Sequence, residues 1–239
     1  MTTGNYQHST NKLYWVKRNL LATDFPAVDQ ALRDPDGLLA IGGDLTIDRL
    51  LNAYQRGIFP WFNEGQPILW WSPDPRCVLQ PSEIKISRSL AKRIRKNEYR
   101  ITYNTAFIEV LEGCASTRNG IKDTWITNDI KFAYIKLFEK GYAHSVECWQ
   151  GNQLVGGLYG LALGKVFFGE SMFSKASDAS KIALVHLAQQ LEQKDFRLID
   201  CQVHSKHLQS MGAKPIHREM FIQILANYCN IDKTLDWVY

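Results

Sequence analysis

From about residue 76 onward, apolar and polar residues follow the spacing of helices and strands in turn. Apolar residues at steps of three and four predict helices over Ser87–Asn97, Thr105–Ala115, 128–140, Ser177–Lys194, His207–Met211 and Arg218–Asn230. Short runs rich in apolar and β-branched residues predict strands at Tyr99–Asn104, Ala143–Gln150, Gln153–Leu163, Val166–Glu170 and Arg197–Val203. Gly151-Asn152 predicts a hairpin turn between the second and third of these strands.

The first part of the chain, to about Pro75, is dominated by turn-forming Gly, Pro and Asp residues. One helix is predicted there: Thr46 can cap its start, Leu50, Leu51 and Tyr54 form its apolar stripe, and Gly57 ends it. The change in pattern predicts two domains, a small N-terminal domain over residues 1–75 and a larger one over 76–239.

Consecutive antiparallel strands, a helix and a further strand predict an α/β (α+β) fold with helices on both faces of a mixed sheet. This order resembles the acetyltransferase-like (GNAT) domain. A resemblance of fold alone says little about chemistry.

Composition favours an ordinary globular protein, since 45% of the 239 residues are hydrophobic and 22% are charged. No apolar run approaches the roughly 20 residues that span a bilayer, and Met1–Thr10 does not resemble a signal peptide. The five cysteines are scattered and form no C-x-x-C pair, and the histidines show no ligand spacing. We therefore expect a cytoplasmic protein with reduced thiols, no metal site and no membrane partner.

Positive charge is concentrated between Lys85 and Arg100, where seven basic residues face one acid, Glu98. The helix predicted there carries the candidate nucleic-acid-binding residues Arg88, Lys92, Arg93, Arg95 and Lys96. Most of them recur at steps of three and four and share one face, and such a face attracts phosphate backbones. The alternative, a solvated helix surface, stays open on composition alone.

Aromatic residues crowd the stretch from Phe59 to Trp71, which also includes Trp61 and Trp70. They can form a small packed core or a domain seam. They can also stack nucleotide bases. The sequence pattern leaves both interpretations open.

The strand Arg197–Val203 contains two polar residues, Asp200 and Gln202, in an apolar run. Alternation along a strand places both on one face and Ile199, Cys201 and Val203 on the other. Burying such groups unsatisfied costs about 1–3 kcal/mol each, so they indicate a hydrogen-bonded core network or a site. Glu170, at the end of another apolar strand, is either a strand-terminal capping group or an anion that orients an amine.

Eight blocks of sequence resemble those of the leucyl/phenylalanyl-tRNA–protein transferases. In chain order they are Asp36–Leu45, Tyr54–Phe62, Trp70–Arg76, Thr124–Thr127, His144–Glu147, Leu154–Gly160, Gly169–Ser174 and Leu198–Val203. Their order and combination are specific, and we see no departure at the motif positions.

The resemblance implies transfer of leucine or phenylalanine, and methionine less well, from aminoacyl-tRNA to proteins that begin with Lys or Arg. Products of this family are marked for N-end rule degradation, and the reaction needs no metal or organic cofactor. The resemblance places the catalytic pair on Asp200 and Gln202. It places the aminoacyl pocket on Leu158, Phe167, Glu170, Leu184, Leu187 and Ile199, with Trp61 and Trp125 beside the tRNA 3′ end.

Because the donor ester is already activated, the enzyme mainly has to align an amine with it, and positioning can supply about 7–11 kcal/mol of a barrier. Our hypothesis is that Gln202 hydrogen-bonds the attacking amine and that Asp200 orients this arrangement. Proton transfer to Asp200 and relay by a tRNA ribose hydroxyl both stay open. Glu170 is the first candidate to meet the Lys or Arg side chain of the acceptor.

Two other functions compete with this one. An acyl-CoA-dependent N-acetyltransferase would cradle pyrophosphate on a [QR]-x-x-G-x-[GA] loop that opens a helix, but the nearest match, Gln153–Leu158, fails at its last position and lies in a predicted strand. A non-catalytic RNA-binding module would use the basic helix and the tryptophans, but it leaves the Asp200, Gln202 and Glu170 arrangement unexplained.

Overall fold

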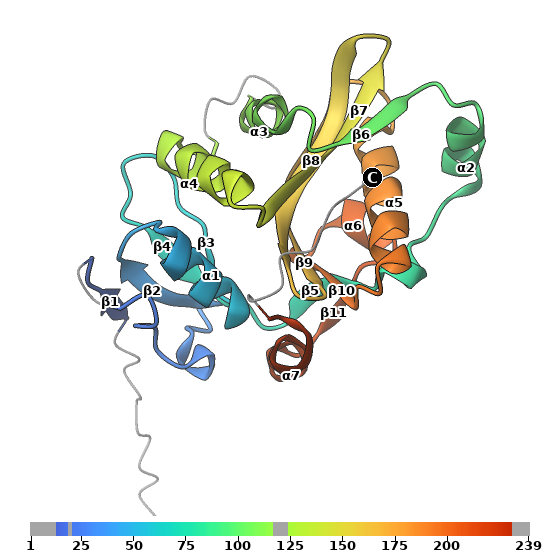
Figure 1. The fold of residues 1–239 in the computed structure, drawn as a ribbon. Coiled ribbons are helices and arrows are strands. Elements are labelled where there is room, and N and C mark those ends of the chain that lie inside the picture. Colours follow the sequence, from blue (N-terminus) through green and yellow to red (C-terminus); the bar gives the residue numbers. More distant parts are fainter. Residues whose placement is uncertain (1–12, 19–20, 117–123, 231–239) are drawn as a thin grey trace, which may run out of the picture.

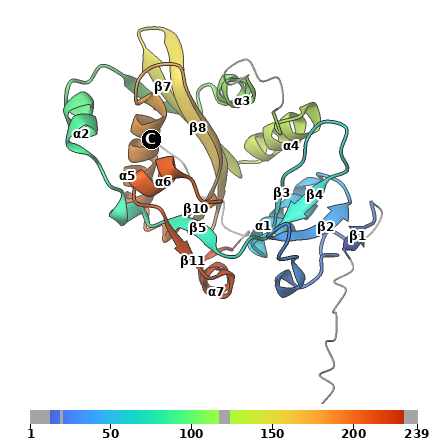
Figure 2. The same ribbon diagram turned by 180° about the vertical axis from the view of Figure 1, so that it is seen from behind.

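The computed structural model describes residues 13–18, 21–116 and 124–230, and the expectation made for Met1–Thr10 lies outside them. Among these residues no helix has the length and apolar character to cross a membrane. Figures 1 and 2 show two groups of elements side by side, one built by the early part of the chain and one by the rest.

The early group contains a mixed four-stranded sheet in the order β1-β2-β4-β3. Its elements are β1 (Tyr14–Val16), η1 (Val28–Gln30), β2 (Leu38–Gly42), α1 (Ile47–Gln55), β3 (Phe59–Pro60) and β4 (Leu69–Trp71). The predicted helix is confirmed as α1. Thr46 stands at its N-cap but makes no side-chain cap bond, because its hydroxyl donates to Asp44 instead (2.6 Å).

The later group contains a mixed seven-stranded sheet in the order β11-β5-β10-β9-β8-β7-β6, and β9 and β10 run parallel. Its strands are β5 (Arg76–Leu79), β6 (Arg100–Tyr103), β7 (Ala143–Gln150), β8 (Gln153–Leu163), β9 (Val166–Ser174), β10 (Leu198–Gln202) and β11 (Lys214–Ile216). Its helices are η2 (Pro81–Glu83), α2 (Arg88–Arg95), α3 (Phe107–Ala115), α4 (Asn128–Glu139), α5 (Ala179–Gln193), α6 (Lys206–Ser210) and α7 (Arg218–Tyr228).

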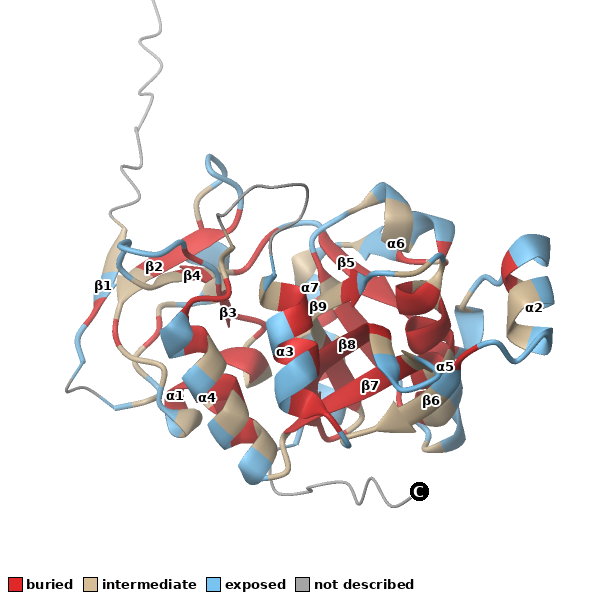
Figure 3. Cartoon of the chain, turned by 90° about the horizontal axis from the view of Figure 1, so that it is seen from above, coloured by how far each residue is buried: buried red, intermediate tan, exposed pale blue. Residues whose placement is uncertain are grey.

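Helices cover both faces of the larger sheet, with α3 and α4 on one face and α5 on the other (Figures 1 and 3). Alternate residues of β8 contribute to the hydrophobic clusters on the two faces of the sheet. Tyr159 and Leu161 belong to the apolar cluster that contains α3 and α4, whereas Leu158 and Ala162 belong to the cluster that contains α5. The predicted fold class, a mixed sheet with flanking helices, is therefore confirmed.

The predicted division at residue 75 falls between β4 and β5, so each sheet takes its strands from one side of it. Contacts cross the division nevertheless. The Tyr54 hydroxyl on α1 donates to Glu170 on β9, and the carbonyl oxygen of Gly57 accepts from Arg76. We keep the two-domain division as a proposal.

Candidate active site

A cavity of about 900 Å³ opens where β9 and β10 separate. The two parallel strands pair only as far as Phe168 and Asp200. Beyond that point β9 continues along β8 to Ser174, while β10 ends at Gln202 against β5. Because the strands diverge, residues from both faces of the sheet can line the space between them.

All ten residues predicted for catalysis or for substrate binding lie on the wall of this cavity. They are Trp61, Trp125, Leu158, Phe167, Glu170, Leu184, Leu187, Ile199, Asp200 and Gln202. They come from both parts of the chain, since Trp61 follows β3 whereas the others lie beyond residue 76.

The apolar part of the wall belongs to the α5 side of the sheet. Leu158, Phe167, Leu184, Leu187 and Ile199 are buried members of one hydrophobic cluster. These side chains come from three strands and one helix that are packed together, so they form a fixed apolar recess. Such a recess can take an apolar side chain of moderate size.

The polar part of the wall centres on Asp200, whose side chain is fully buried. Its Oδ1 and Oδ2 accept hydrogen bonds from Nε and Nη2 of Arg76, at 2.8 and 2.7 Å. Oδ1 also accepts the backbone N–H of Gln202 (2.9 Å). The carboxylate is thus neutralised and held in one orientation.

Gln202 adopts a left-handed backbone conformation, with φ of 59°. The register of β10 against β5 shifts between Asp200 and Gln202, and both neighbours, Cys201 and Val203, also line the cavity. Cys201 nevertheless packs with Ile199 against the hydrophobic cluster on the α5 side of the sheet, as the alternation predicts, whereas Val203 lies beyond the end of β10 and its predicted face stays a prediction. The irregularity ends the regular pairing of β10 with β5 at Gln202.

Gln202 links the two acidic residues of the cavity wall, because its backbone N–H donates to Asp200 and its side chain donates to Glu170. Its Nε2 donates to Oε1 of Glu170 (3.0 Å), which leaves its own Oε1 as an acceptor that can face a substrate. Glu170 also accepts the hydroxyls of Tyr54 (2.7 Å) and Tyr134 (2.8 Å), one at each oxygen. These two hydroxyls contact each other as well.

The environment of Glu170 raises its pKa to about 7. Burial is the main cause, and the negative charge of Asp200 acts in the same direction. The hydrogen bonds from the two tyrosines stabilise the ionised form and limit the increase. Glu170 therefore changes its charge near neutral pH.

Glu170→Gln is expected to change how the free energy of unfolding depends on pH. The folded pKa lies near 7, above the ordinary value of 4.5, so the folded protein binds the proton more tightly than the unfolded chain. This stabilisation is complete below the unfolded pKa and is lost as pH rises through the folded pKa. Urea unfolding between about pH 5 and 8 should show the wild type losing stability relative to the variant. A difference that stays constant with pH would contradict the raised pKa.

The two predicted tryptophans lie at the cavity with different exposure. Trp61 is 44% exposed, and its ring lies 5.6 Å from that of Trp71, centroid to centroid. The Trp71 indole N–H donates to the carbonyl oxygen of Trp61 (2.7 Å), which fixes the local backbone. Trp125 is half-buried. Phe59 and Trp70 are buried core residues.

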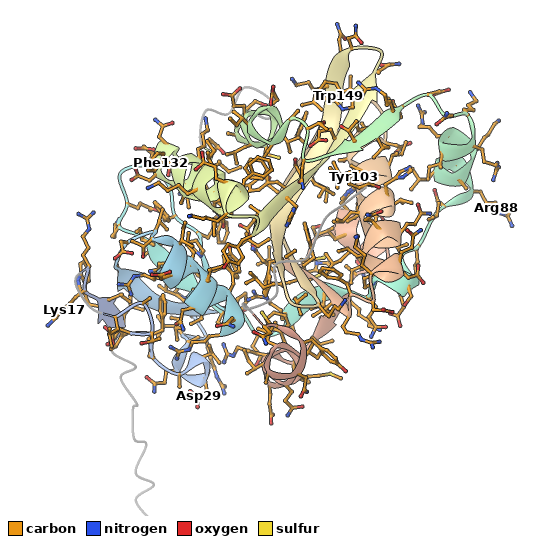
Figure 4. The ribbon with its side chains drawn as sticks, viewed as in Figure 1. Lys17, Asp29, Arg88, Tyr103, Phe132 and Trp149 are labelled. Atoms are coloured by element: carbon orange, nitrogen blue, oxygen red, sulfur yellow. The ribbon has the colours of Figure 1, made fainter. Side chains whose placement is uncertain are left out.

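The predicted basic helix is α2, and none of its residues lies on the cavity wall. Arg88, Lys92, Arg95 and Lys96, here called the basic face, are exposed, and Arg88 points away from the body of the protein in Figure 4. Lys96 pairs with Glu98 (3.3 Å). Arg93 differs from the basic face, because it is half-buried and pairs with both Glu98 (3.5 Å) and Asp178 (3.3 Å). Asp178 stands just before α5, whose Ser180 lines the cavity.

Sequence reasoning assigned no role to Arg76, Tyr54 or Tyr134, although all three bind acidic residues of the site. Arg76 begins the apolar strand β5, so a charge in a predicted buried strand could have marked it. No comparable signal marks the tyrosines, which look like ordinary core residues of α1 and α4.

A metal centre finds no support in the part of the chain that the structure describes, since no group of three or more His, Cys, Asp or Glu side chains could hold an ion there. The Gln153–Leu158 segment, which resembles a pyrophosphate loop, lies within strand β8 and does not open a helix. The expectation that no cofactor is needed stays a prediction.

Similarity to solved structures is weak. The chain matches L-PGS from Bacillus licheniformis with a TM-score of 0.41 and 12% identity, covering 71% of this chain and 56% of that one. It matches a GCN5-related N-acetyltransferase from Kribbella flavida with a TM-score of 0.37 and 9% identity, covering 68% and 58%. Such scores support no conclusion about activity.

Similarity to protein sequences is strong. The family model for leucyl/phenylalanyl-tRNA protein transferase matches residues 78–226, and the model for the N-terminal domain of the same family matches residues 43–74. A leucyl/phenylalanyl-tRNA–protein transferase of Stutzerimonas stutzeri is 55% identical over 94% of this chain and 99% of its own length. One from Thiobacillus denitrificans is 57% identical over 88% and 92%.

Both parts of the chain, including the cavity and the segment that carries Tyr54, thus match one group of enzymes. The chain belongs to the leucyl/phenylalanyl-tRNA–protein transferase family, whose members transfer aminoacyl groups from tRNA to proteins.

Proposed function

We propose that this enzyme transfers leucine or phenylalanine, and methionine less well, from aminoacyl-tRNA to proteins that begin with Lys or Arg. The observation that carries the proposal is the apolar recess that opens beside Asp200 and Gln202. The product would carry a new N-terminal residue that directs it to N-end rule degradation. We place the reaction in the cytoplasm, in keeping with five free cysteines.

In this proposal the donor side chain enters the recess formed by Leu158, Phe167, Leu184, Leu187 and Ile199. An apolar pocket separates side chains by only about 1–3 kcal/mol per methylene, so leucine, methionine and phenylalanine all fit. Charged donors are excluded by the cost of desolvation. The terminal nucleotide of the tRNA, which carries the donor amino acid, is proposed to lie beside Trp61 and Trp125. The exposed Trp61 is the better placed of the two to stack a base.

The acceptor α-amine attacks the carbonyl carbon of the ester, and the bond to the tRNA ribose oxygen breaks. Oε1 of Gln202 accepts a hydrogen bond from the amine, because its Nε2 is held by Glu170. Asp200 fixes the backbone of Gln202. The bidentate contact with Arg76 favours this orienting role for Asp200 over proton transfer, so the amine proton passes to the ribose oxygen, directly or through a neighbouring hydroxyl.

Glu170 is proposed to meet the positive charge of the acceptor. A carboxylate offers about four lone-pair sites, and three of these accept bonds from Tyr54, Tyr134 and Gln202. One site remains for a donor on the incoming protein. The attraction strengthens as Glu170 ionises. Because its pKa is raised to about 7, this ionisation takes place near neutral pH.

The basic face of α2 is proposed to hold tRNA through its phosphates, without reading sequence. Changing its four residues to Gln should weaken tRNA binding and flatten its salt dependence. Each lost phosphate contact lowers the slope of log affinity against log salt by about 0.7–0.9. Fluorescence anisotropy at several salt concentrations measures this slope. The control is Lys136→Gln with Lys140→Gln, since Lys136 lies in the last turn of the distant helix α4 and Lys140 is its C-cap. An unchanged slope in the α2 variant would contradict the assignment.

One assay tests the proposed function directly. Purified protein is given charged leucyl-tRNA and peptides that differ only in residue one, and the products are weighed by mass spectrometry. We expect leucine on Arg- and Lys-initiated peptides and none on Ala- or Glu-initiated ones. Absence of transfer, or transfer that ignores residue one, would overturn the proposal.

A further inference from the structure

Arg76 is a completely enclosed charged residue near the cavity. Its side chain is fully buried, and its guanidinium donates to both oxygens of Asp200 and to the carbonyl oxygen of Gly57 (3.1 Å). The rings of Phe59 and Phe221 lie 4.7 and 4.6 Å from it, from ring centroid to Cζ. All three of its nitrogens therefore donate hydrogen bonds, and two aromatic rings contact the same guanidinium.

Arg76 does not touch the cavity, since it is absent from the residues that line it. Its partners come from separate parts of the fold. Gly57 and Phe59 belong to the early part of the chain, Phe221 to α7, and Asp200 to β10. Arg76 thus links three segments at one point behind the cavity wall.

The backbone of Gln202 needs such support. A φ of 59° is sparsely populated by residues other than glycine. The N–H of Gln202 donates to Oδ1 of Asp200 (2.9 Å), the same oxygen that accepts from Nε of Arg76 (2.8 Å). The orientation of the Asp200 carboxylate, and with it the position of Gln202, therefore depends on the guanidinium.

We propose that Arg76 is a positioning residue for aminoacyl transfer: it fixes the Asp200 carboxylate, which holds Gln202 against the substrate. The inference rests on the proposed function, in which Gln202 contacts the attacking amine. It predicts that Arg76 affects kcat without affecting donor binding.

The test compares Arg76→Lys with the wild type. Lysine keeps the charge but cannot hold both carboxylate oxygens in a planar fork. We expect kcat per folded enzyme to fall about tenfold or more, as small misplacements at active sites do. The KM for leucyl-tRNA should stay within about twofold, since the apolar residues proposed to hold the donor side chain are unchanged. Wild-type kcat in folded Arg76→Lys would overturn the proposal, whereas failure of the wild type to transfer at all would overturn the proposed function instead.

Arg49→Lys is the matched control. Arg49 is also buried and pairs with an acid, Asp44 (3.2 Å), but it lies outside the cavity wall. Both variants should lose thermal stability, and only Arg76→Lys should lose kcat. An equal loss of kcat in the two variants would show a general structural effect and overturn the proposal.

A double variant tests whether Arg76 acts on catalysis through Gln202. If Arg76 acts through Gln202, adding Arg76→Lys to Gln202→Ala should lower kcat by less than about twofold further, because coupled residues are not additive. Fully multiplicative losses would overturn the proposal.

If Arg76→Lys does not fold, Phe221→Leu replaces it, since it keeps every charge and removes one ring from the guanidinium. We then expect kcat to fall about threefold, and an unchanged kcat would overturn the proposal.

Discussion

Asp200→Asn is expected to lower kcat for leucine transfer about 100-fold or more, the scale of a misplacement of about 1 Å at an active site. Asparagine keeps the size of the side chain but removes its charge, and its NH2 group cannot accept from Nη2 of Arg76 as Oδ2 does. The side-chain oxygen that holds the N–H of Gln202 then loses its fixed orientation. The donor recess is untouched, so the KM for leucyl-tRNA should change little. Single-turnover transfer to an Arg-initiated peptide measures the chemical step.

Loss of stability must be separated from loss of chemistry in this variant, because removing one partner of a buried ion pair costs about 3–5 kcal/mol. Asp44→Asn is the matched control, since it removes the acidic partner of the buried Arg49 away from the cavity. We expect it to lower the melting temperature and to leave kcat per folded molecule unchanged. Full activity in folded Asp200→Asn would refute the role assigned to Asp200.

Leu184→Phe is expected to change donor selectivity strongly. Leu184 is buried at the wall between α5 and the sheet, and the added ring volume occupies space proposed for the donor side chain. Transfer of phenylalanine should fall at least about tenfold relative to leucine. A fall of this size lies within the roughly 1–3 kcal/mol by which an apolar pocket separates side chains that differ by one methylene. Competition between the two charged tRNAs in one reaction gives the ratio of kcat/KM.

Leu191→Phe controls for overpacking in the same helix. Leu191 is fully buried on α5 but is not part of the cavity wall. Its replacement should reduce stability by about 1–3 kcal/mol and leave the ratio of phenylalanine to leucine transfer as in the wild type. The same ratio in Leu184→Phe as in the wild type would place the donor side chain elsewhere.

The regular elements of the later part of the chain were predictable because their local signals agree with their packing. The hairpin of β7 and β8 has the predicted bounds, since each strand is long and Gly151 accepts the positive φ of the turn. Helix α4 begins where Thr127 caps it, with the Thr127 hydroxyl oxygen accepting the N–H of Ile130. The predicted strand Val166–Glu170 is shorter than β9, because the polar residues at the end of β9 have the composition of a loop. Pairing with β8 extends the strand to Ser174.

The strands of the early part of the chain could not be predicted in the same way. β1, β3 and β4 are two or three residues long, too short to show a period. Their stability comes from pairing and from buried aromatic residues such as Trp70, whose indole N–H donates to the carbonyl oxygen of Gly42 (2.8 Å). Tertiary contacts of this kind leave no local signal in the sequence.

Some features of the cavity have a local signal in the sequence, whereas others depend on tertiary contacts. Apolar residues on one strand face predict a recess, and polar residues inside a strand indicate a site. The separation of β9 from β10, the register shift before Gln202 and the approach of Arg76 to Asp200 all depend on contacts between residues distant in sequence. The alternation expected along β10 holds for Ile199 and Cys201, which pack on the α5 side of the sheet, but it does not predict the register shift before Gln202.

The most direct test of the central claim is a crystal structure with a hydrolysis-resistant adenosine that carries phenylalanine through a 3′ amide. We predict that the phenyl ring packs among Leu184, Leu187 and Ile199, with the amide carbonyl beside the Gln202 side chain. A ligand bound with its phenyl ring elsewhere, and with the recess empty, would contradict the account.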